Sequence, residues 1–194
     1  MIIGITGGSG TGKSSACTYF DRMGYVIIDA DTVAREVCAP GTECLAELVA
    51  YFGGDIVDGD GTLMRKKLGS LVFADSSKLM ALNEITHKHI IKSIKEKIAD
   101  NEGRDIVVDA PLLLETGLDS LCDVTLCVIS SADNRISRIM ARDGISAEDA
   151  QNRIQSQKDD SYYISRCDHT VTNNGSPDEL IHKLSRIFGG DHGK

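Results

Sequence analysis

The sequence feature that most constrains this chain is a glycine-rich segment, residues 7–14 (GGSGTGKS), which follows an apolar stretch at residues 1–6. These eight residues match the pattern G-x-x-x-x-G-K-[ST] in full. Glycines let the backbone wrap so that successive N–H groups point into one concavity, and the helix predicted to follow adds the positive end of its dipole. Lys13 offers a point charge for the β- and γ-phosphates of a nucleotide, and the Ser14 hydroxyl can ligate Mg²⁺. An ordinary strand-to-helix turn is the alternative, but the full motif in its strand–loop–helix context favours a phosphate-binding loop.

Composition and charge narrow the class of protein. The chain has 194 residues, 41% hydrophobic and 26% charged, as is typical of a globular protein with one core and small appended units. Its net charge of −8 argues against broad binding to nucleic acid or to a membrane surface. No apolar run approaches the roughly 20 residues of a membrane span, and no signal peptide is visible, so we expect a cytoplasmic protein. The six cysteines show neither a C-x-x-C pair nor zinc spacing, and we expect mostly buried thiols.

Two aspartates follow the second apolar stretch, residues 25–28 (YVII). This stretch is typical of a buried parallel strand, and ligands of open α/β sheets bind beyond the carboxyl ends of such strands. We expect Asp29 and Asp31 to point to the same face of the extended chain at that end. The alternative for Asp31 is a capping role for a helix that begins near Thr32.

A third strand is predicted at residues 105–109 (DIVVD), and it ends in Asp109. A carboxylate in this place suits a site that orients Mg²⁺ or a metal-bound water, so Ser14 and Asp109 are the candidate metal ligands. The alternative for Asp109 is a helix-capping or turn role.

The stretch from about residue 32 to 103 reads as helical and lies between two core strands. It contains a basic amphipathic segment with Arg65, Lys66 and Lys67, then a long helix that begins near Ser76 and runs to about Ala99. A helical insertion on a phosphate-loop core is therefore predicted.

A second helical stretch follows the strand predicted at residues 124–129. Its first helix carries Arg135, Arg138 and Arg142 on one face, and a second helix is predicted to start at a capping box at residues 146–149 and to reach roughly Tyr162. Two helices with an arginine face indicate a mobile lid over a nucleotide, and a solvated basic face is the alternative. A weak last strand at residues 168–172 and a final helix with a Ser-Pro start complete the chain.

A phosphate loop alone does not choose between kinase, GTPase, motor and switch. The guanine-specific N/T-K-x-D motif is missing, since the nearest string, QKDD at residues 157–160, lacks the Asn or Thr. A small-molecule kinase fits best, because it needs an acceptor pocket and a water-excluding lid. Asp31 would then accept the proton of the acceptor hydroxyl, while Lys13 and the lid arginines stabilise the transferred phosphoryl group.

With these residues placed, the chain resembles the dephospho-coenzyme A kinase family over nearly its whole length. The most specific matches are Asp-Ala-Asp at 29–31, Pro-Leu-Leu-Leu-Glu at 111–115 and the arginine segment at 138–143, and further matches include Arg65–Leu68, Gln157 and Asn-Asn-Gly at 173–175. The resemblance implies an α/β phosphate-loop kinase fold with a five-stranded parallel sheet flanked by helices, a helical substrate-binding insertion and a helical lid. It implies ATP-dependent phosphorylation of the ribose 3′-hydroxyl of dephospho-CoA, the last step of CoA synthesis, with Mg²⁺. A kinase for a nucleoside monophosphate or another small alcohol, and a non-catalytic nucleotide switch, are the alternatives.

The resemblance also implies which residues form the site. The catalytic set is Asp31, Lys13, Arg138 and Arg142. The ATP set is Gly8, Gly10, Thr11, Gly12, Lys13, Ser14, Ser15 and Asn173. The acceptor set is Asp29, Arg65, Lys66, His87, Pro111, Leu112 and Leu113.

Domain boundaries follow from the same assignments, and two positions depart from the family pattern. Residues 1–31, 104–130 and 165–194 are expected to form the nucleotide-binding core, residues 32–103 the insertion, and residues 131–164 the lid. His87-Lys88 stands where the family usually has His-Pro, and Thr172 stands where an Asp usually precedes Asn-Asn-Gly.

Overall fold

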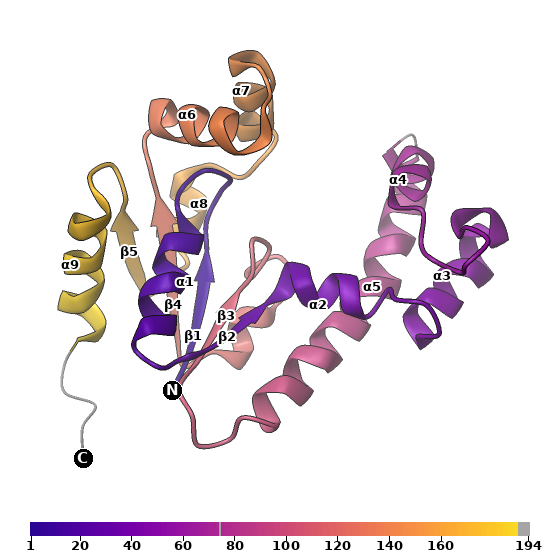
Figure 1. The fold of residues 1–194 in the computed structure, drawn as a ribbon, viewed down its shortest axis with the longest axis horizontal. Helices are drawn as coiled ribbons and strands as arrows, with labels where there is room; N and C mark the ends of the chain where they lie inside the picture. The colour runs from indigo at the N-terminus through magenta and orange to yellow at the C-terminus, as the bar shows by residue number, and fades with distance from the viewer. Residues whose placement is uncertain (74, 190–194) are drawn as a thin grey trace. The chain divides into compact units, whose positions relative to one another are not determined.

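A five-stranded parallel sheet forms the centre of the first of two compact units (Figure 1). The computed structural model describes residues 1–73 and 75–189. The strand order is β2-β3-β1-β4-β5, with β1 paired in parallel to both β3 and β4, and β4 to β5. The strands are β1 (Ile2–Thr6), β2 (Val26–Asp29), β3 (Ile106–Asp109), β4 (Val124–Ile129) and β5 (His169–Thr172). The predicted α/β fold with a five-stranded parallel sheet is confirmed.

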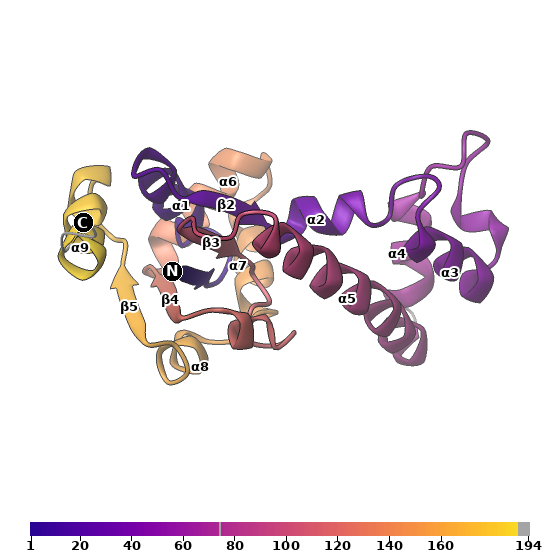
Figure 2. The same ribbon diagram turned by 90° about the horizontal axis from the view of Figure 1, so that it is seen from below.

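Helices cover both faces of this sheet, which explains why its central strands are apolar on both sides. Figure 2 shows α1 (Lys13–Arg22) and α9 (Pro177–Phe188) on one face and α8 (Asp160–Ile164) on the other. Phe20 of α1 lies 5.2 Å, between ring centroids, from Phe188 of α9, in an edge-on arrangement that joins the two helices. The start of α9 follows the prediction, because Pro177 occupies its first turn and the Ser176 hydroxyl accepts the N–H of Glu179.

The second unit, residues Asp29–Glu102, is helical and has its own core. Its elements are α2 (Ala30–Glu36), α3 (Glu43–Phe52), a 3₁₀ turn η1 (Gly54–Ile56), α4 (Arg65–Phe73) and α5 (Ser76–Ala99). Leu48 and Ile56 are fully buried at the centre of its hydrophobic cluster. The long helix α5 runs unbroken through His87 and Lys88, and Lys88 forms an ion pair with Glu47 of α3. A lysine in place of proline keeps the backbone N–H that a helix interior needs.

The helical stretch after β4 differs from its prediction in two ways. Helix α6 (Ala132–Asp143) is followed by α7 (Ala147–Gln155), but α7 does not reach Tyr162, because Asp159 caps the separate helix α8 by accepting the Tyr162 N–H. The predicted arginine face of α6 is also wrong in part, since Arg135 is 5% exposed whereas the Arg142 side chain is 60% exposed. Figure 1 shows α6 and α7 beyond the carboxyl end of β1.

The 3₁₀ turn η2 (Leu118–Leu121) connects the segment after β3 to β4. All six cysteines lie in the described part of the chain, none forms a disulfide, and four of them are buried, as predicted. Within the two described ranges, no helix combines the length and apolar character that a bilayer crossing requires.

Candidate nucleotide-binding site

The glycine-rich segment forms a loop between the end of β1 and the start of α1. Gly12 is the N-cap of α1 with a left-handed backbone (φ 99°), which a glycine adopts without steric cost. The Thr11 hydroxyl, fully buried, donates to the Gly8 carbonyl at 2.9 Å and so closes the turn. Lys13 Nζ donates to the Gly7 carbonyl at 2.8 Å, which holds its charge beside the loop. The loop therefore joins backbone N–H groups, a helix N-terminus and a lysine, the three features that bind phosphate.

Strand order explains what lies against this loop. β3 and β2 lie on one side of β1 in the sheet, whereas β4 and β5 lie on its other side. The connections therefore run in opposite directions from the point between β1 and β4, and ligands of open α/β sheets bind at such a point. Helix α6 follows β4 and Asn173 follows β5, and both contact the loop. Arg138 donates to the carbonyls of Gly10 and Thr11 at 3.1 and 3.2 Å.

Asn173 completes this attachment. Its side-chain N–H₂ donates to the Thr11 carbonyl at 2.9 Å, and its own carbonyl accepts from Arg138 at 3.0 Å. It is 6% exposed. A Cβ on Gly12 would lie 2.1 Å from the Asn173 amide nitrogen, so the glycine is needed for close approach as well as for its backbone conformation.

Arg135 and Gln157 hold the first half of the loop. Arg135 Nε donates to the Ser9 carbonyl and the Gln157 amide oxygen accepts from the Ser9 N–H, both at 2.9 Å. Helical periodicity placed Arg135 only on an arginine face, and no sequence pattern indicated a role for Gln157. No local pattern could have found these contacts, because they join positions 126 and 148 residues apart.

Of the two predicted metal ligands, Asp109 lies at the end of β3 and Ser14 lies in the helix that follows the neighbouring strand β1. Asp109 is the last residue of β3 and pairs in register with Ile5 of β1, just before the loop, while Ser14 lies in the first turn of α1. Ser14 and Ser15 are exposed there. In the described ranges, no group of three or more His, Cys, Asp or Glu side chains could hold a metal on its own. A hydroxyl and one carboxylate fit an ion that takes its other ligands from phosphate and water, as Mg²⁺ does.

Asp29 and Asp31 differ from the prediction in their backbone placement. Strand β2 ends at Asp29 and α2 begins at Ala30, so Asp31 lies in the first turn of a helix and the two side chains do not share a strand face. Asp29 is the helix cap, since its carboxylate accepts from the N–H groups of Asp31 and Thr32 at 2.8 and 3.3 Å. The alternative in which Asp31 caps this helix is therefore wrong. Among the described residues, nothing hydrogen-bonds to the exposed Asp31 carboxylate or forms an ion pair with it.

The predicted acceptor residues fall in both units. Pro111, Leu112 and Leu113 follow β3, and the Pro111 carbonyl accepts from the Thr6 hydroxyl at 3.2 Å. Leu112 is 52% exposed, whereas Leu113 is fully buried, so Leu112 presents its side chain to solvent and Leu113 does not.

The other predicted acceptor residues belong to the second unit. Arg65 and Lys66 are exposed in the first turn of α4. His87 is half-buried in α5, and this burial lowers its pKa below the ordinary 6.5. His87 is therefore neutral near pH 7 and would act as a hydrogen-bonding group rather than as a cation.

Helix α6 ends in a cluster of three charged side chains. Arg142, predicted to be catalytic, donates to Asp143 through Nε at 2.7 Å and through a terminal nitrogen at 2.9 Å, and Arg153 of α7 also pairs with Asp143. Hydrogen bonds from Arg142 and then Arg153 lower the pKa of Asp143 from 3.8 to about 2. The Arg142 side chain remains 60% exposed, in contrast to the attached Arg138.

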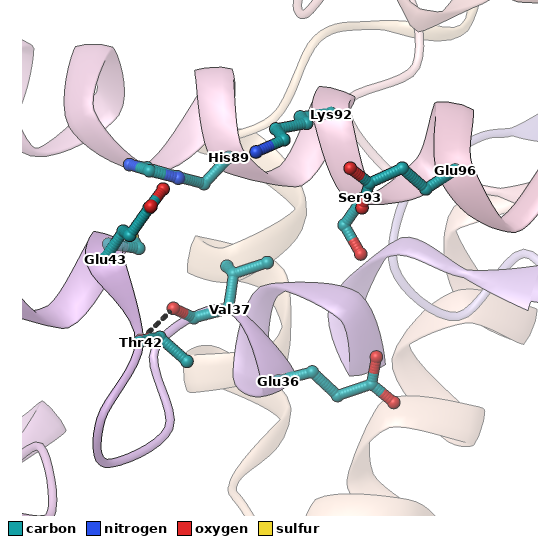
Figure 3. Close-up of a pocket in the computed structure, with 9 residues that line it drawn as sticks. Glu36, Val37, Thr42, Glu43, His89, Lys92, Ser93 and Glu96 are labelled. Atoms are coloured by element: carbon teal, nitrogen blue, oxygen red, sulfur yellow. Dashed lines mark hydrogen bonds between the residues drawn. The ribbon is translucent and has the colours of Figure 1, made fainter.

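A pocket of about 340 Å³ lies within the second unit, between the α2–α3 connection and α5 (Figure 3). Glu43 and His89 project towards each other across it, and Thr42 donates to the Val37 carbonyl at 2.6 Å along its wall. None of the acceptor residues predicted from the sequence lines this pocket.

A parallel sheet in this strand order, with a phosphate loop after its first strand and arginines of a following helix attached to the loop, defines a phosphate-loop kinase fold. A solved protein from Thermus thermophilus has the same fold, with a TM-score of 0.84, 30% identity and coverage of 100% of this chain and 98% of its own. The chain belongs to the dephospho-CoA kinase family, whose sequence model it matches over residues 1–179.

Two relatives show how far this likeness extends. The Corynebacterium efficiens protein named dephospho-CoA kinase is 38% identical, across 97% of this chain and 96% of the relative. The solved dephospho-CoA kinase from Campylobacter jejuni has a TM-score of 0.72 at 24% identity, covering 97% of this chain and 95% of its own. The expected family is thus confirmed over nearly the whole length.

Proposed function

We propose that this chain transfers the γ-phosphoryl group of ATP to the ribose 3′-hydroxyl of dephospho-CoA, giving coenzyme A and ADP. Membership of the dephospho-CoA kinase family over residues 1–179 carries this proposal, because a phosphate loop by itself does not choose the acceptor. The six cysteines, all in the described part of the chain, are free thiols, which fits a reducing compartment, and we propose the cytoplasm.

The loop residues bind the nucleotide in this proposal. Backbone N–H groups of Gly8, Gly10, Thr11, Gly12 and the first turn of α1, with Ser15 among them, contact the phosphates. Lys13 lies beside the loop through its contact with the Gly7 carbonyl and supplies positive charge to the β- and γ-phosphates. Asn173 keeps the Thr11 carbonyl turned away from the phosphates by donating to it.

Charge on the transferred group is balanced from two further sources. Ser14 and Asp109 would hold Mg²⁺, which neutralises charge on the β- and γ-phosphate oxygens when bound. Arg138 adds a fixed positive charge at the loop, where four hydrogen bonds hold its guanidinium. Arg142 is the more mobile partner, because an exposed pair with Asp143 contributes little and can be exchanged for a phosphate.

Asp31 is the proposed base. Its carboxylate is exposed and not engaged with another described residue, so it can accept the proton of the acceptor hydroxyl and orient that oxygen for attack. Asp29 fixes the helix turn that carries Asp31 and contributes to acceptor binding in that indirect way. Arg65, Lys66, His87, Pro111, Leu112 and Leu113 complete the proposed acceptor set.

An acceptor panel tests the proposal. Purified protein with ATP and Mg²⁺ is given dephospho-CoA, AMP, UMP or dTMP, and ADP release is measured. Dephospho-CoA should give the highest kcat/KM. Turnover of a nucleoside monophosphate instead would assign a nucleotide kinase, and ATP binding without acceptor-dependent ADP release would assign a switch.

A variant pair tests the base. Asp31→Asn should lower kcat at least about 10²-fold, the range of a lost general base, while the ATP dissociation constant changes less than about twofold. Asp60→Asn, at an exposed turn of the same unit, is the matched control and should keep the wild-type rate. A full rate in Asp31→Asn would remove Asp31 as the base.

A further inference from the structure

Every polar group of Ser9, the third residue of the phosphate loop, is bound by side chains from the helical segment after β4. The Gln157 amide oxygen accepts the Ser9 N–H, the Gln157 amide nitrogen donates to the Ser9 hydroxyl, and Arg135 Nε donates to the Ser9 carbonyl, each at 2.9 Å. Ser9 therefore offers no free N–H to a phosphate, and its contacts serve to hold the loop.

The same two side chains are bound to each other. A terminal nitrogen of Arg135 donates to the Gln157 amide oxygen at 2.9 Å, and another lies 3.6 Å from the Asp160 carboxylate. Arg135 is 5% exposed, so its hydrogen bonds are largely shielded from water. The amide oxygen of Gln157 thus accepts two hydrogen bonds at once, one from the loop and one from a charged group.

Gln157 lies at a particular place in the chain, between the end of α7 at Gln155 and the start of α8 at Asp160. Arg135 lies in the first turn of α6. The first half of the loop is therefore attached to both ends of the α6–α7 hairpin, the outgoing end through Arg135 and the returning end through Gln157.

We propose that Gln157 is a positioning residue for nucleotide binding, an inference that rests on the proposed kinase function and adds a residue to it. Gln157 fixes Ser9 and, through it, the backbone turn into Gly10, whose left-handed conformation (φ 77°) begins the half of the loop that holds most of the proposed phosphate contacts. A loop held in its binding conformation before ATP arrives loses less conformational freedom on binding. Without the Gln157 side chain, the loop must become ordered when ATP binds, and this lowers the affinity for ATP.

The test compares four variants of the full chain by direct ATP binding, by steady-state kinetics with dephospho-CoA, and by thermal unfolding. Gln157→Ala removes the side chain, Gln157→Met keeps its length without hydrogen bonds, and Gln157→Glu keeps both acceptor interactions. Gln155→Ala, an exposed glutamine two residues away, is the matched control.

Gln157→Ala and Gln157→Met should each weaken ATP binding about tenfold, because each variant loses the three hydrogen bonds of the Gln157 side chain, of which the one with Arg135 is charge-assisted. Gln157→Glu should stay within about threefold of wild type, because the Arg135 guanidinium already lies against the oxygen it would charge. The KM for dephospho-CoA and the affinity of Gln155→Ala for ATP should change less than about twofold.

Three results would overturn the inference: wild-type ATP affinity in Gln157→Met, which would assign the effect to packing; equal weakening for ATP and dephospho-CoA; or a lower Tm with unchanged ATP affinity. The direct binding arm needs no acceptor turnover. A wild-type chain that binds ATP but leaves dephospho-CoA unphosphorylated would therefore refute the proposed function and still decide the role of Gln157.

Discussion

Substitution of Gly12 by alanine tests whether the phosphate loop is shaped by Asn173. Two costs arise at this position. The left-handed backbone (φ 99°) costs a non-glycine residue about 1–2 kcal/mol, and the new Cβ would lie 2.1 Å from the Asn173 amide nitrogen. Displacement of that amide removes its buried hydrogen bond to the Thr11 carbonyl, worth a further ~0.5–1.5 kcal/mol. Gly12→Ala should therefore lower the free energy of unfolding by about 2–3 kcal/mol.

Gly24 provides the matched control for this substitution. It has a similar backbone (φ 90°), but no atom lies within 4 Å of the position a Cβ would take, so Gly24→Ala should show the backbone cost alone. The assay is urea unfolding of both variants, of Asn173→Ala and of the Gly12→Ala/Asn173→Ala double variant. Because the clash and the lost hydrogen bond involve one side chain, the double variant should lose about 1 kcal/mol less than the sum of the singles. Additivity within about 0.3–0.5 kcal/mol, or equal losses for Gly12→Ala and Gly24→Ala, would refute the reasoning.

Two further predictions concern single side chains. Leu113→Ala should lower the free energy of unfolding, measured with urea, by about 2–5 kcal/mol, because Leu113 is fully buried. Leu112→Ala should leave the free energy of unfolding within about 0.5 kcal/mol of wild type and alter the KM for dephospho-CoA, because Leu112 is 52% exposed. The opposite pattern in urea unfolding and kinetics would contradict both placements. The carboxyl of Asp143 should titrate near pH 2 in a side-chain NMR titration and return towards 3.8 when Arg142 and Arg153 are replaced by alanine. Its depressed pKa means that its contribution to stability is present above about pH 4 and is lost as the pH falls towards 2, so a wild-type midpoint near 3.8 would exclude the paired arrangement.

The sequence predicted elements well where a capping signal and a hydrophobic pattern coincide. Helix α9 begins after Ser176 with Pro177 in its first turn, and α5 spans Ser76–Ala99 as expected. The α7–α8 boundary could not be found in the same way. The boundary is set by the Asp159 side chain, which accepts a hydrogen bond from the Tyr162 N–H. In a segment whose sequence is otherwise typical of a helix, this aspartate cannot be told from an ordinary exposed residue.

The burial of Arg135 shows a different limit of sequence patterns. Helical periodicity put Arg135 on a polar face with Arg138 and Arg142, because arginine is rarely buried. The structure buries it against the loop carbonyl of Ser9 and the amide of Gln157, partners that satisfy its donors. Only the strand order, which places the helix after β4 beside the loop after β1, makes this arrangement possible.

The glycines of the phosphate loop are needed for this packing against Arg135 as well as for binding the nucleotide. A Cβ on Gly8 would lie 2.3 Å from a terminal nitrogen of Arg135, and one on Gly10 would lie 2.7 Å from the Arg135 carbonyl. The glycine pattern, which the approach of phosphate explains locally, is thus also required by the backbone and side chain of Arg135, 126 residues from Ser9. Substitution of a loop glycine therefore disturbs both the phosphate-binding conformation of the loop and the attachment of the loop to α6. Loss of ATP binding in such a variant cannot be assigned to the phosphate contact until the attachment is tested separately, which the Gln157 variants do without altering the loop itself.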